Sequence, residues 1–244
     1  MADDIRYTLQ GNSMQYLEIA LEEDQTVIAE AGHLLYMEEG IRFETRMGDG
    51  AGSAFGALFG AAKRMITGES LFMTHFTNRR DDPKKVAFAA PYPGQIVPVQ
   101  LSEHDGEIIC QKDAFLAAAR GTEVDVVFNR RLGVGFFGGE GFVLQRLRGE
   151  GLAFLHAGGS IVEKTLHGET LRVDTGCVVG FEEDIDYDVE LAGGLRSMLF
   201  GGEGMFLATL EGHGKVWLQS LPFARLADRV LENAVHEERQ DEDT

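Results

Sequence analysis

The sequence contains nearly the same twenty-residue stretch twice. Residues 137–156 read FGGEGFVLQRLRGEGLAFLH, and residues 200–219 read FGGEGMFLATLEGHGKVWLQ. Aligned without gaps, the two stretches are identical at ten positions, where chance gives about one or two. The shared residues are glycines and spaced leucines, a pattern typical of two strands joined by a glycine turn. The stretch is therefore an internal repeat of a β-rich unit.

A weaker third copy lies earlier in the chain, in DQTVIAEAGHLLYM (24–37) and TGESLFMTHF (67–76). Equivalent segments in the three copies alternate at period two, which predicts half-buried strands in matching phase. The residues predicted to face the core are Ile41, Phe43 and Thr45; Thr122, Val124 and Val126; and Ile185, Tyr187 and Val189.

The fold class that follows is all-β, with three tandem, short, sandwich-like repeats. The predicted boundaries are 1–103, 104–166 and 167–221, and the first repeat carries a Gly/Ala-rich insertion at 48–66. Apolar residues at helical spacing predict a short C-terminal helix over 222–237. The charged residues 238–244 predict an acidic disordered tail.

Composition narrows the classes of partner. The chain has 40 acidic and 22 basic residues, a net charge of −18, which disfavours binding to nucleic acid backbones and anionic lipid. Two cysteines, Cys110 and Cys177, give no disulfide framework. The start, MADDIRYT, has neither an apolar nor a basic leader pattern. We expect a soluble, cytoplasmic protein, and the insertion leaves a peripheral membrane location open.

The chain resembles the altered-inheritance-of-mitochondria protein 24 family and its bacterial members. The resembling stretches are YLEIALEEDQTVIAEAGHLLYMEEGI (16–41), KRMITGESLFMTHFT (63–77) and the two FGGEG hairpins. The family is grouped with TRAP-like proteins, named for the tryptophan RNA-binding attenuation protein. The resemblance implies three short double-stranded β-helix units, assembly into a ring-like homo-oligomer, and no established enzymatic activity.

The acidic stretch EEDIDYDVE (182–190) has two interpretations. On a strand, its alternate carboxylates share one face, where a divalent cation could relieve their repulsion. A straight row cannot wrap an ion as a calcium loop does, so a solvated face is favoured over a cation or basic partner.

Histidines could mark a metal-dependent, cupin-like enzyme. No His-x-His pair occurs, and the seven histidines stand apart in the sequence at 33, 75, 104, 156, 167, 213 and 236. We therefore expect surface or turn histidines, no metal ligands, no cofactor and no catalytic residues. Cys110 lies on an apolar strand and is expected to behave as a small hydrophobe.

Acidic residues recur at equivalent turns of the repeats, namely Glu69, Glu140 and Glu203, with Glu30 and Asp174 at a partner position. They could gather about a pseudo-axis and raise a pKa, or each could accept backbone N–H groups at its own turn. We favour the turn role.

The insertion GDGAGSAFGALFGAAKRM (48–65) is the candidate interaction surface, through Phe55, Leu58, Phe59, Lys63 and Arg64. It could pack on its own unit or subunit, or dock on another protein or a membrane surface.

The leading hypothesis is a non-enzymatic β scaffold or interaction module, for which the family resemblance implies a role in membrane-associated maintenance or stress response. Open strand edges favour a homo-oligomer, with a trimer as the first expectation. The alternatives are an RNA- or small-ligand-binding module and a metal-dependent cupin-like enzyme.

Overall fold

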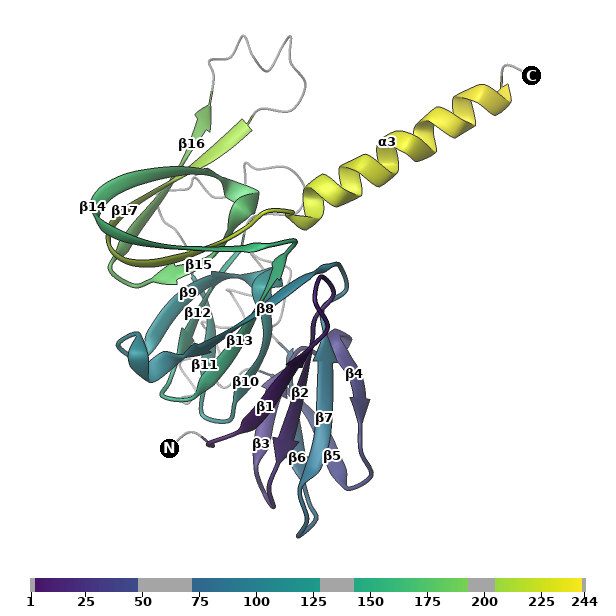
Figure 1. Ribbon diagram of the computed structural model, residues 1–244, viewed down its shortest axis with the longest axis vertical. Helices are drawn as coiled ribbons and strands as arrows, with labels where there is room; N and C mark the ends of the chain where they lie inside the picture. The colour runs from purple at the N-terminus through teal and green to yellow at the C-terminus, as the bar shows by residue number, and fades with distance from the viewer. Residues whose placement is uncertain (1–2, 48–71, 128–142, 193–204, 243–244) are drawn as a thin grey trace.

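The computed structural model describes residues 3–47, 72–127, 143–192 and 205–242 of the chain (Figure 1). Nearly all of the described secondary structure is β-strand, and one α-helix follows the last strand. The predicted all-β class with a C-terminal helix is confirmed.

The N-terminal part of the chain consists of short strands joined by tight turns. In chain order they are β1 (Arg6–Gln10), β2 (Tyr16–Leu21), β3 (Thr26–Ala29), β4 (Leu34–Met37), β5 (Ile41–Met47), β6 (Phe72–Asn78), β7 (Lys84–Ala89) and β8 (Gly94–Gln100). Alternation explains strands such as β2, where Leu17, Ile19 and Leu21 are fully buried and the residues between them are partly exposed.

The rest of the chain continues in the same style and ends in longer strands. These are β9 (Glu107–Gln111), β10 (Phe115–Ala119), β11 (Glu123–Val127), β12 (Leu144–Arg148), β13 (Leu152–Gly158), β14 (Ile161–Asp174), β15 (Val178–Glu182), β16 (Ile185–Ala192) and β17 (Met205–Gln219). Short 3-10 turns stand before β4, β9, β10 and β15, namely η1 (Ala31–His33), η2 (Leu101–Glu103), η3 (Lys112–Ala114) and η4 (Thr175–Cys177).

The strands form antiparallel sheets stacked along the length of the molecule (Figure 1). Their orders are β1-β2-β7-β4, β5-β6-β3-β10-β13-β8, and β11-β12-β9-β15-β17-β14, with β16 added beside β17. The second and third sheets each combine strands from distant parts of the sequence, so neighbouring segments of the chain are bound together by backbone hydrogen bonds.

Apolar clusters lie between and within these sheets. One cluster joins the first and second sheets around Phe76, Phe88 and Phe154. Another joins the second and third sheets and includes Phe115 and Trp217. A third fills the curled third sheet, with members such as Phe181, Leu210 and Val216. The core therefore runs along the molecule and links all of the sheets.

One pattern of pairing occurs three times in the described strands. A strand, a 3-10 turn and a second strand precede a hairpin, as in β3–η1–β4 before β5–β6, β9–η3–β10 before β11–β12, and β14–η4–β15 before β16–β17. In each case the first strand pairs with the second strand of the hairpin. The second strand pairs with the strand after the hairpin in the first two cases, and with the later part of the hairpin strand β17 in the third. The division at 103 and 166, and a double-stranded β-helix form for each unit, stay a prediction.

The predicted phase of the core-facing residues is correct at the start of each segment, where Ile41, Thr122 and Ile185 are buried. It is wrong for Phe43, which is 57% exposed, and for Thr45, which is also exposed. β5 is the end strand of its sheet. Beyond Ile41 the strand therefore has too few described neighbours to bury its inward face.

The helix α3 (Phe223–Glu242) is longer than predicted and extends away from the sheets (Figure 1). It begins directly after Pro222 and continues into residues 238–242, for which the sequence predicts disorder. Glutamate, arginine and glutamine are strong helix formers, and an Arg229–Glu232 ion pair of 3.0 Å supports the exposed helix. High charge therefore does not end this helix.

Candidate functional site

The residues predicted as an interaction surface and as turn acids lie outside the described residues. They are Phe55, Leu58, Phe59, Lys63 and Arg64 in the insertion, and Glu69, Glu140 and Glu203 at the turns. The roles predicted for these residues stay predictions.

Asp174, at the partner position of the turn acids, is described. Its Oδ1 accepts a hydrogen bond of 2.9 Å from the backbone N–H of Gly176 and so caps the turn η4. Its Oδ2 accepts a 3.0 Å hydrogen bond from Arg225 at the start of α3. This carboxylate has the structural turn role, and it also ties the helix to the last sheet.

The acidic stretch 182–190 alternates as a half-buried strand. Asp186, Asp188 and Glu190 are exposed, while Ile185 and Tyr187 between them are buried. Glu190 lies 3.4 Å from Arg172 on β14. Among the described residues no group of three His, Cys, Asp or Glu side chains is placed to hold a metal ion. The three carboxylates face solvent, and the preference for a solvated face over a cation or basic partner stays a prediction.

Two histidines come together from distant segments, His33 in η1 and His156 in β13. Burial lowers the pKa of both imidazoles, to about 4 for His156, on which His33 also acts. The Tyr92 ring packs edge-on against His156 at 4.6 Å between centroids. Both histidines are therefore neutral at pH 7, and His156 has a packing role against Tyr92.

Cys110 is fully buried in the core. Burial raises the pKa of its thiol, so the nucleophilic thiolate is not formed at neutral pH. The prediction that Cys110 behaves as a small hydrophobe fits this placement.

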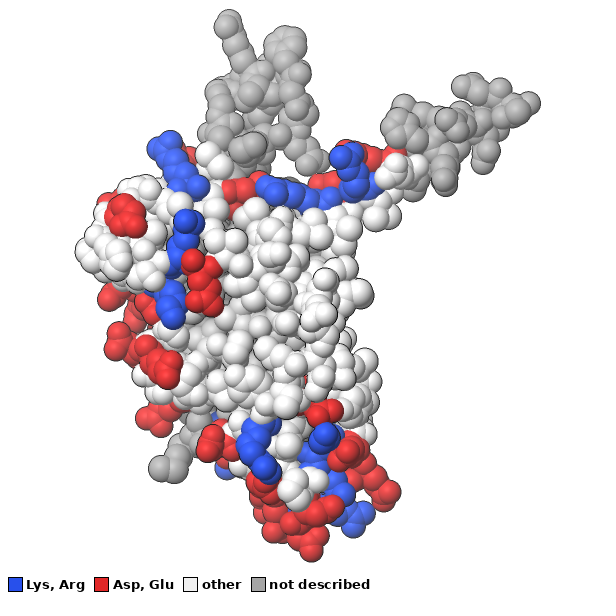
Figure 2. Space-filling model, viewed as in Figure 1, with Lys and Arg blue, Asp and Glu red and all other residues white. Residues whose placement is uncertain are grey.

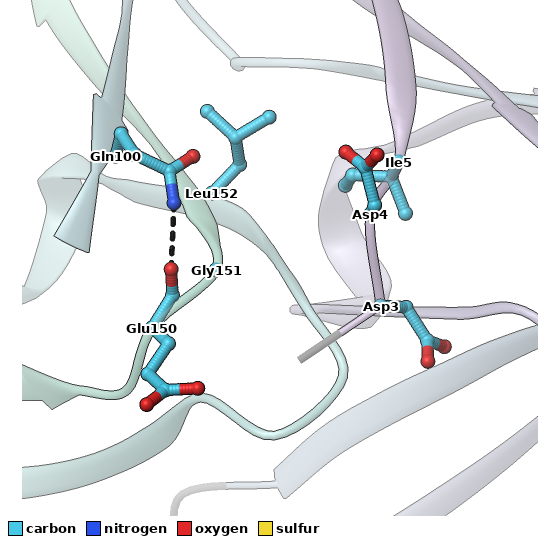
Figure 3. A pocket seen from close by; sticks show the side chains of 7 residues that line it. All are labelled: Asp3, Asp4, Ile5, Gln100, Glu150, Gly151 and Leu152. Atoms are coloured by element: carbon cyan, nitrogen blue, oxygen red, sulfur yellow. Dashed lines mark hydrogen bonds between the residues drawn. The ribbon is translucent and has the colours of Figure 1, made fainter. Parts of the chain in front are cut away.

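A pocket of about 260 Å³ opens between the N-terminus and the turn before β13 (Figure 3). Its lining residues are Asp3, Asp4, Ile5, Gln100, Glu150, Gly151 and Leu152. Asp3 accepts from the backbone N–H of Thr26, and Gln100 donates to the carbonyl oxygen of Glu150 at 2.6 Å. The lining offers no histidine, cysteine or basic group, so it does not supply an anion site, and its polar groups are carboxylates and amides.

The described surface carries one strand whose edge and side chains are both uncovered. The β4 edge, Leu34–Met37, pairs with β7 and with no other described strand. All four side chains are apolar or aromatic and at least 36% exposed, with Leu35 at 50%. Natural edge strands are usually protected by charges, proline or a covering segment. β4 itself has neither charge nor proline, and no other described strand covers its edge, which marks it as a surface for association.

The Tyr36 side chain is fixed in place on this surface. Its hydroxyl donates to the carboxylate of Glu18, which also accepts a 2.7 Å hydrogen bond from Lys85. The Glu18 partner, together with partial burial, raises the pKa of Tyr36 to about 12. Lys85, and after it Tyr36, lower the pKa of Glu18. The aromatic ring is thus held against β2 and β7, and the backbone of β4 stays accessible.

A second open edge lies at the other end of the molecule. The β14 edge, residues 170–174, pairs with β17, and no described strand pairs with its opposite side. Gly168, at φ +102°, forms part of an irregularity between His167 and Thr170, where glycine tolerates the positive φ. In Figure 1, β4 lies with β1–β7 at one end, and β14 lies with β16 and β17 at the other.

Comparison with known proteins gives concordant matches. The model of the family Mitochondrial biogenesis AIM24 matches residues 7–221. The uncharacterized protein M6_Spy0233 of Streptococcus pyogenes serotype M6 is 33% identical over 227 residues, which covers 91% of this chain and 88% of the relative. The crystal structure of the protein SPYM3_0169 from Streptococcus pyogenes has a TM-score of 0.73 at 27% identity. It covers 94% of this chain and 99% of that one.

Proposed function

The chain belongs to the Mitochondrial biogenesis AIM24 family, and we propose that it is a non-enzymatic β scaffold that works as a homo-oligomer. The observation that carries the proposal is the β4 edge, where four exposed apolar side chains coincide with unpaired backbone groups. Association through this edge would satisfy both the side chains and the backbone. Membrane-associated maintenance or stress response is the process we propose, from the family resemblance.

The arrangement of polar side chains supports a scaffold over a metal-dependent, cupin-like enzyme. The described histidines come from different elements. His33 and His156 are partly or fully buried and neutral, and His167 lies opposite His213 at an exposed position of β14 and β17. The pocket beside the N-terminus is lined by carboxylates and amides. Catalysis by an activated serine or cysteine needs that nucleophile beside a base, and the pocket lining contains no serine, cysteine or histidine.

The charge distribution supports a protein partner over RNA. On the face shown in Figure 2, Lys and Arg lie beside Asp and Glu toward the ends of the molecule and form no continuous basic track. Single-stranded nucleic acid binding requires such a track lined by aromatic side chains. A net charge of −18 adds repulsion.

No helix among the described residues is long and apolar enough to cross a membrane. The membrane contact that we propose is a peripheral one. The insertion 48–66 is the segment we propose for such a contact, or for a contact with another protein. Flotation with liposomes tests this role: the intact chain should float and a 50–66 deletion should not.

The experiment that tests the scaffold is native mass at micromolar concentration. We expect an oligomer of the 26.8 kDa chain, with the trimer as the first expectation, and a monomer for Leu35→Lys. The matched control is Val162→Lys, which changes another exposed apolar residue, 42% exposed on the first half of β14, and should leave the oligomer intact. A wild-type chain that is monomeric would refute the proposal.

A further inference from the structure

Two strand pairings join successive units of the chain, and they have the same form. β10 pairs antiparallel with β3, with Ala117 opposite Ala29. β15 pairs antiparallel with β9, with Gly180 opposite Cys110. In both, the strand after a 3-10 turn joins the strand before the 3-10 turn of the preceding unit.

These joints explain how the complete sheets are built. In the second sheet, the half-sheet β5-β6-β3 continues through the pairing of β3 with β10 into the half-sheet β10-β13-β8. In the third sheet, β11-β12-β9 continues in the same way into β15-β17-β14. Each complete sheet is therefore two half-sheets joined edge to edge.

Half a sheet is left over at each end of the chain. At one end β4-β7-β2 stops at the β4 edge, and at the other β16-β17-β14 stops at the β14 edge. The two edges correspond to the two sides of the internal joints, because β4 follows η1 and the second half of β14 precedes η4. They lie at opposite ends of the molecule (Figure 1), so one chain cannot pair them with each other.

We propose that the β4 edge of one copy pairs antiparallel with the β14 edge of the next copy and completes one more sheet. The proposal deepens the homo-oligomeric scaffold and rests on it. The occupant of the β4 edge is thus a second copy of this chain, bound head to tail.

The internal joints also fix the register. Within the units, Leu34, Phe115 and Val178 stand opposite Phe88, Leu155 and Leu218, which makes Tyr36 the equivalent of Ala117 and Gly180. Val173 stands opposite Ala208, as Ala29 stands opposite Thr74 and Cys110 opposite Gln145. In the joint between copies Tyr36 therefore lies opposite Val173, and Met37 lies opposite Arg172.

Burial agrees with this pairing. Phe115 to Ala119 are all buried at the internal joint, and so are Thr26 to Ala29 on the facing strand. The matching residues 34–37 are exposed, and 170–174 are exposed or half-buried. The joint between copies also includes the polar groups of Tyr36 and Arg172, which suits surfaces that meet water before they assemble.

A head-to-tail joint uses two different surfaces, so the contact is heterologous and forms either a closed ring or an open filament. We expect a ring, because the joint repeats a geometry that the chain already uses internally. A two-fold symmetric dimer would bury β4 against β4 and would contradict the proposal.

Disulfide trapping tests the register. The double variant Tyr36→Cys/Val173→Cys, made with Cys177→Ser, should form disulfides between copies on oxidation, since opposed residues in antiparallel strands have Cα atoms about 4.5–5.5 Å apart. Denaturing gels should show a ladder that ends at the ring size. The control Tyr36→Cys/Thr170→Cys places the second cysteine three residues along the strand, about 10 Å away, and should give at least tenfold less product.

Hydrogen exchange of the wild-type chain provides a second measurement that needs no substitution. Backbone amides in 34–38 and 170–174 should be protected in the oligomer and exchange at least tenfold faster on dilution to monomer. An oligomer that gives neither trapping nor protection at these edges would overturn the register and leave the scaffold standing. A monomeric chain would overturn both.

Discussion

β10 and β4 occupy equivalent places in the pairing pattern and have similar compositions, but they have opposite environments. Phe115–Ala119 is buried throughout and lies between β3 and β13. Leu34–Met37 is exposed throughout and has a single described neighbour. The difference is the preceding unit: β10 has β3 to pair with, and β4 is in the first unit of the chain. An apolar strand of this family is therefore a core element or a docking surface according to what stands next to it.

The comparison of β10 with β4 predicts the largest difference in stability when an arginine is placed at equivalent positions of the two strands. Ala118→Arg buries a cation where Ala118 packs opposite Ile28, which should cost at least about 4 kcal/mol and prevent folding. Met37→Arg places the same charge at the exposed equivalent and should leave the monomer folded but abolish the oligomer. Thermal melts followed by circular dichroism, together with native mass, distinguish the outcomes. A folded Ala118→Arg chain would break the comparison.

Truncation at the first residue of each strand should give the next largest difference. Phe115→Ala removes a fully buried ring and should lower the free energy of unfolding by about 3–5 kcal/mol. Leu34→Ala removes a side chain that is 37% exposed and should cost the monomer less than about 1 kcal/mol. Denaturant titration at a dilution where the chain is monomeric measures both. Equal losses would mean that β4 is as well packed as β10.

A smaller effect is the pH dependence of stability, which arises from a difference between β13, beside β10, and β7, beside β4. β13, beside β10, carries His156 one residue after Leu155, where β7, beside β4, carries Ala89 after Phe88. His156 is 2% exposed and faces Tyr92 and His33, with Asp113 acting on both of these neighbours. Burial, followed by the effect of His33, lowers the pKa of His156 to about 4, below its unfolded value of about 6.5.

The sign follows from that order of pKa values. The unfolded state binds the proton first, so this contribution to stability is complete above about pH 6.5 and is lost as pH falls toward 4. At about pH 5 the loss should be about 2 kcal/mol. His156→Gln, with the residue type that Gln219 supplies at the equivalent position of β17, should reduce this acid dependence. Denaturant midpoints near pH 7 and near pH 5 measure it, and an unchanged slope in the variant would assign the acid loss to other groups.

Much of the fold could be predicted from the sequence because the repeated segments show the strand alternation and the glycine turns directly. The alternation that places Ile185 and Tyr187 inward is local, and glycine turns mark the ends of strands. Asp174 as a turn cap follows from its position before Gly176. These features are determined by residues that are close together in the sequence, so they can be recognised from a single sequence.

The open edges could not be predicted from the sequence. LLYM in β4 and VVGF in β15 are equally apolar, and only the pairing of strands from different units distinguishes an exposed edge from a buried one. The meeting of His33 with His156 has the same cause, since the two residues stand far apart in sequence. The sequence instead predicts an interaction surface in the insertion 48–66, because this segment is unusually rich in glycine and alanine.

The smallest predicted effect separates the side chains of β4 from its backbone. Tyr36→Phe removes the hydroxyl that donates to Glu18. Because the pair is exposed to solvent, the monomer should lose only a few tenths of a kcal/mol. Glu18 keeps its bond to Lys85, and the apolar ring remains part of the exposed surface of β4, so the oligomer should persist with little change in its dissociation constant. Loss of the oligomer in Tyr36→Phe would show that the hydroxyl, and not the apolar strand with its unpaired backbone, holds the copies together.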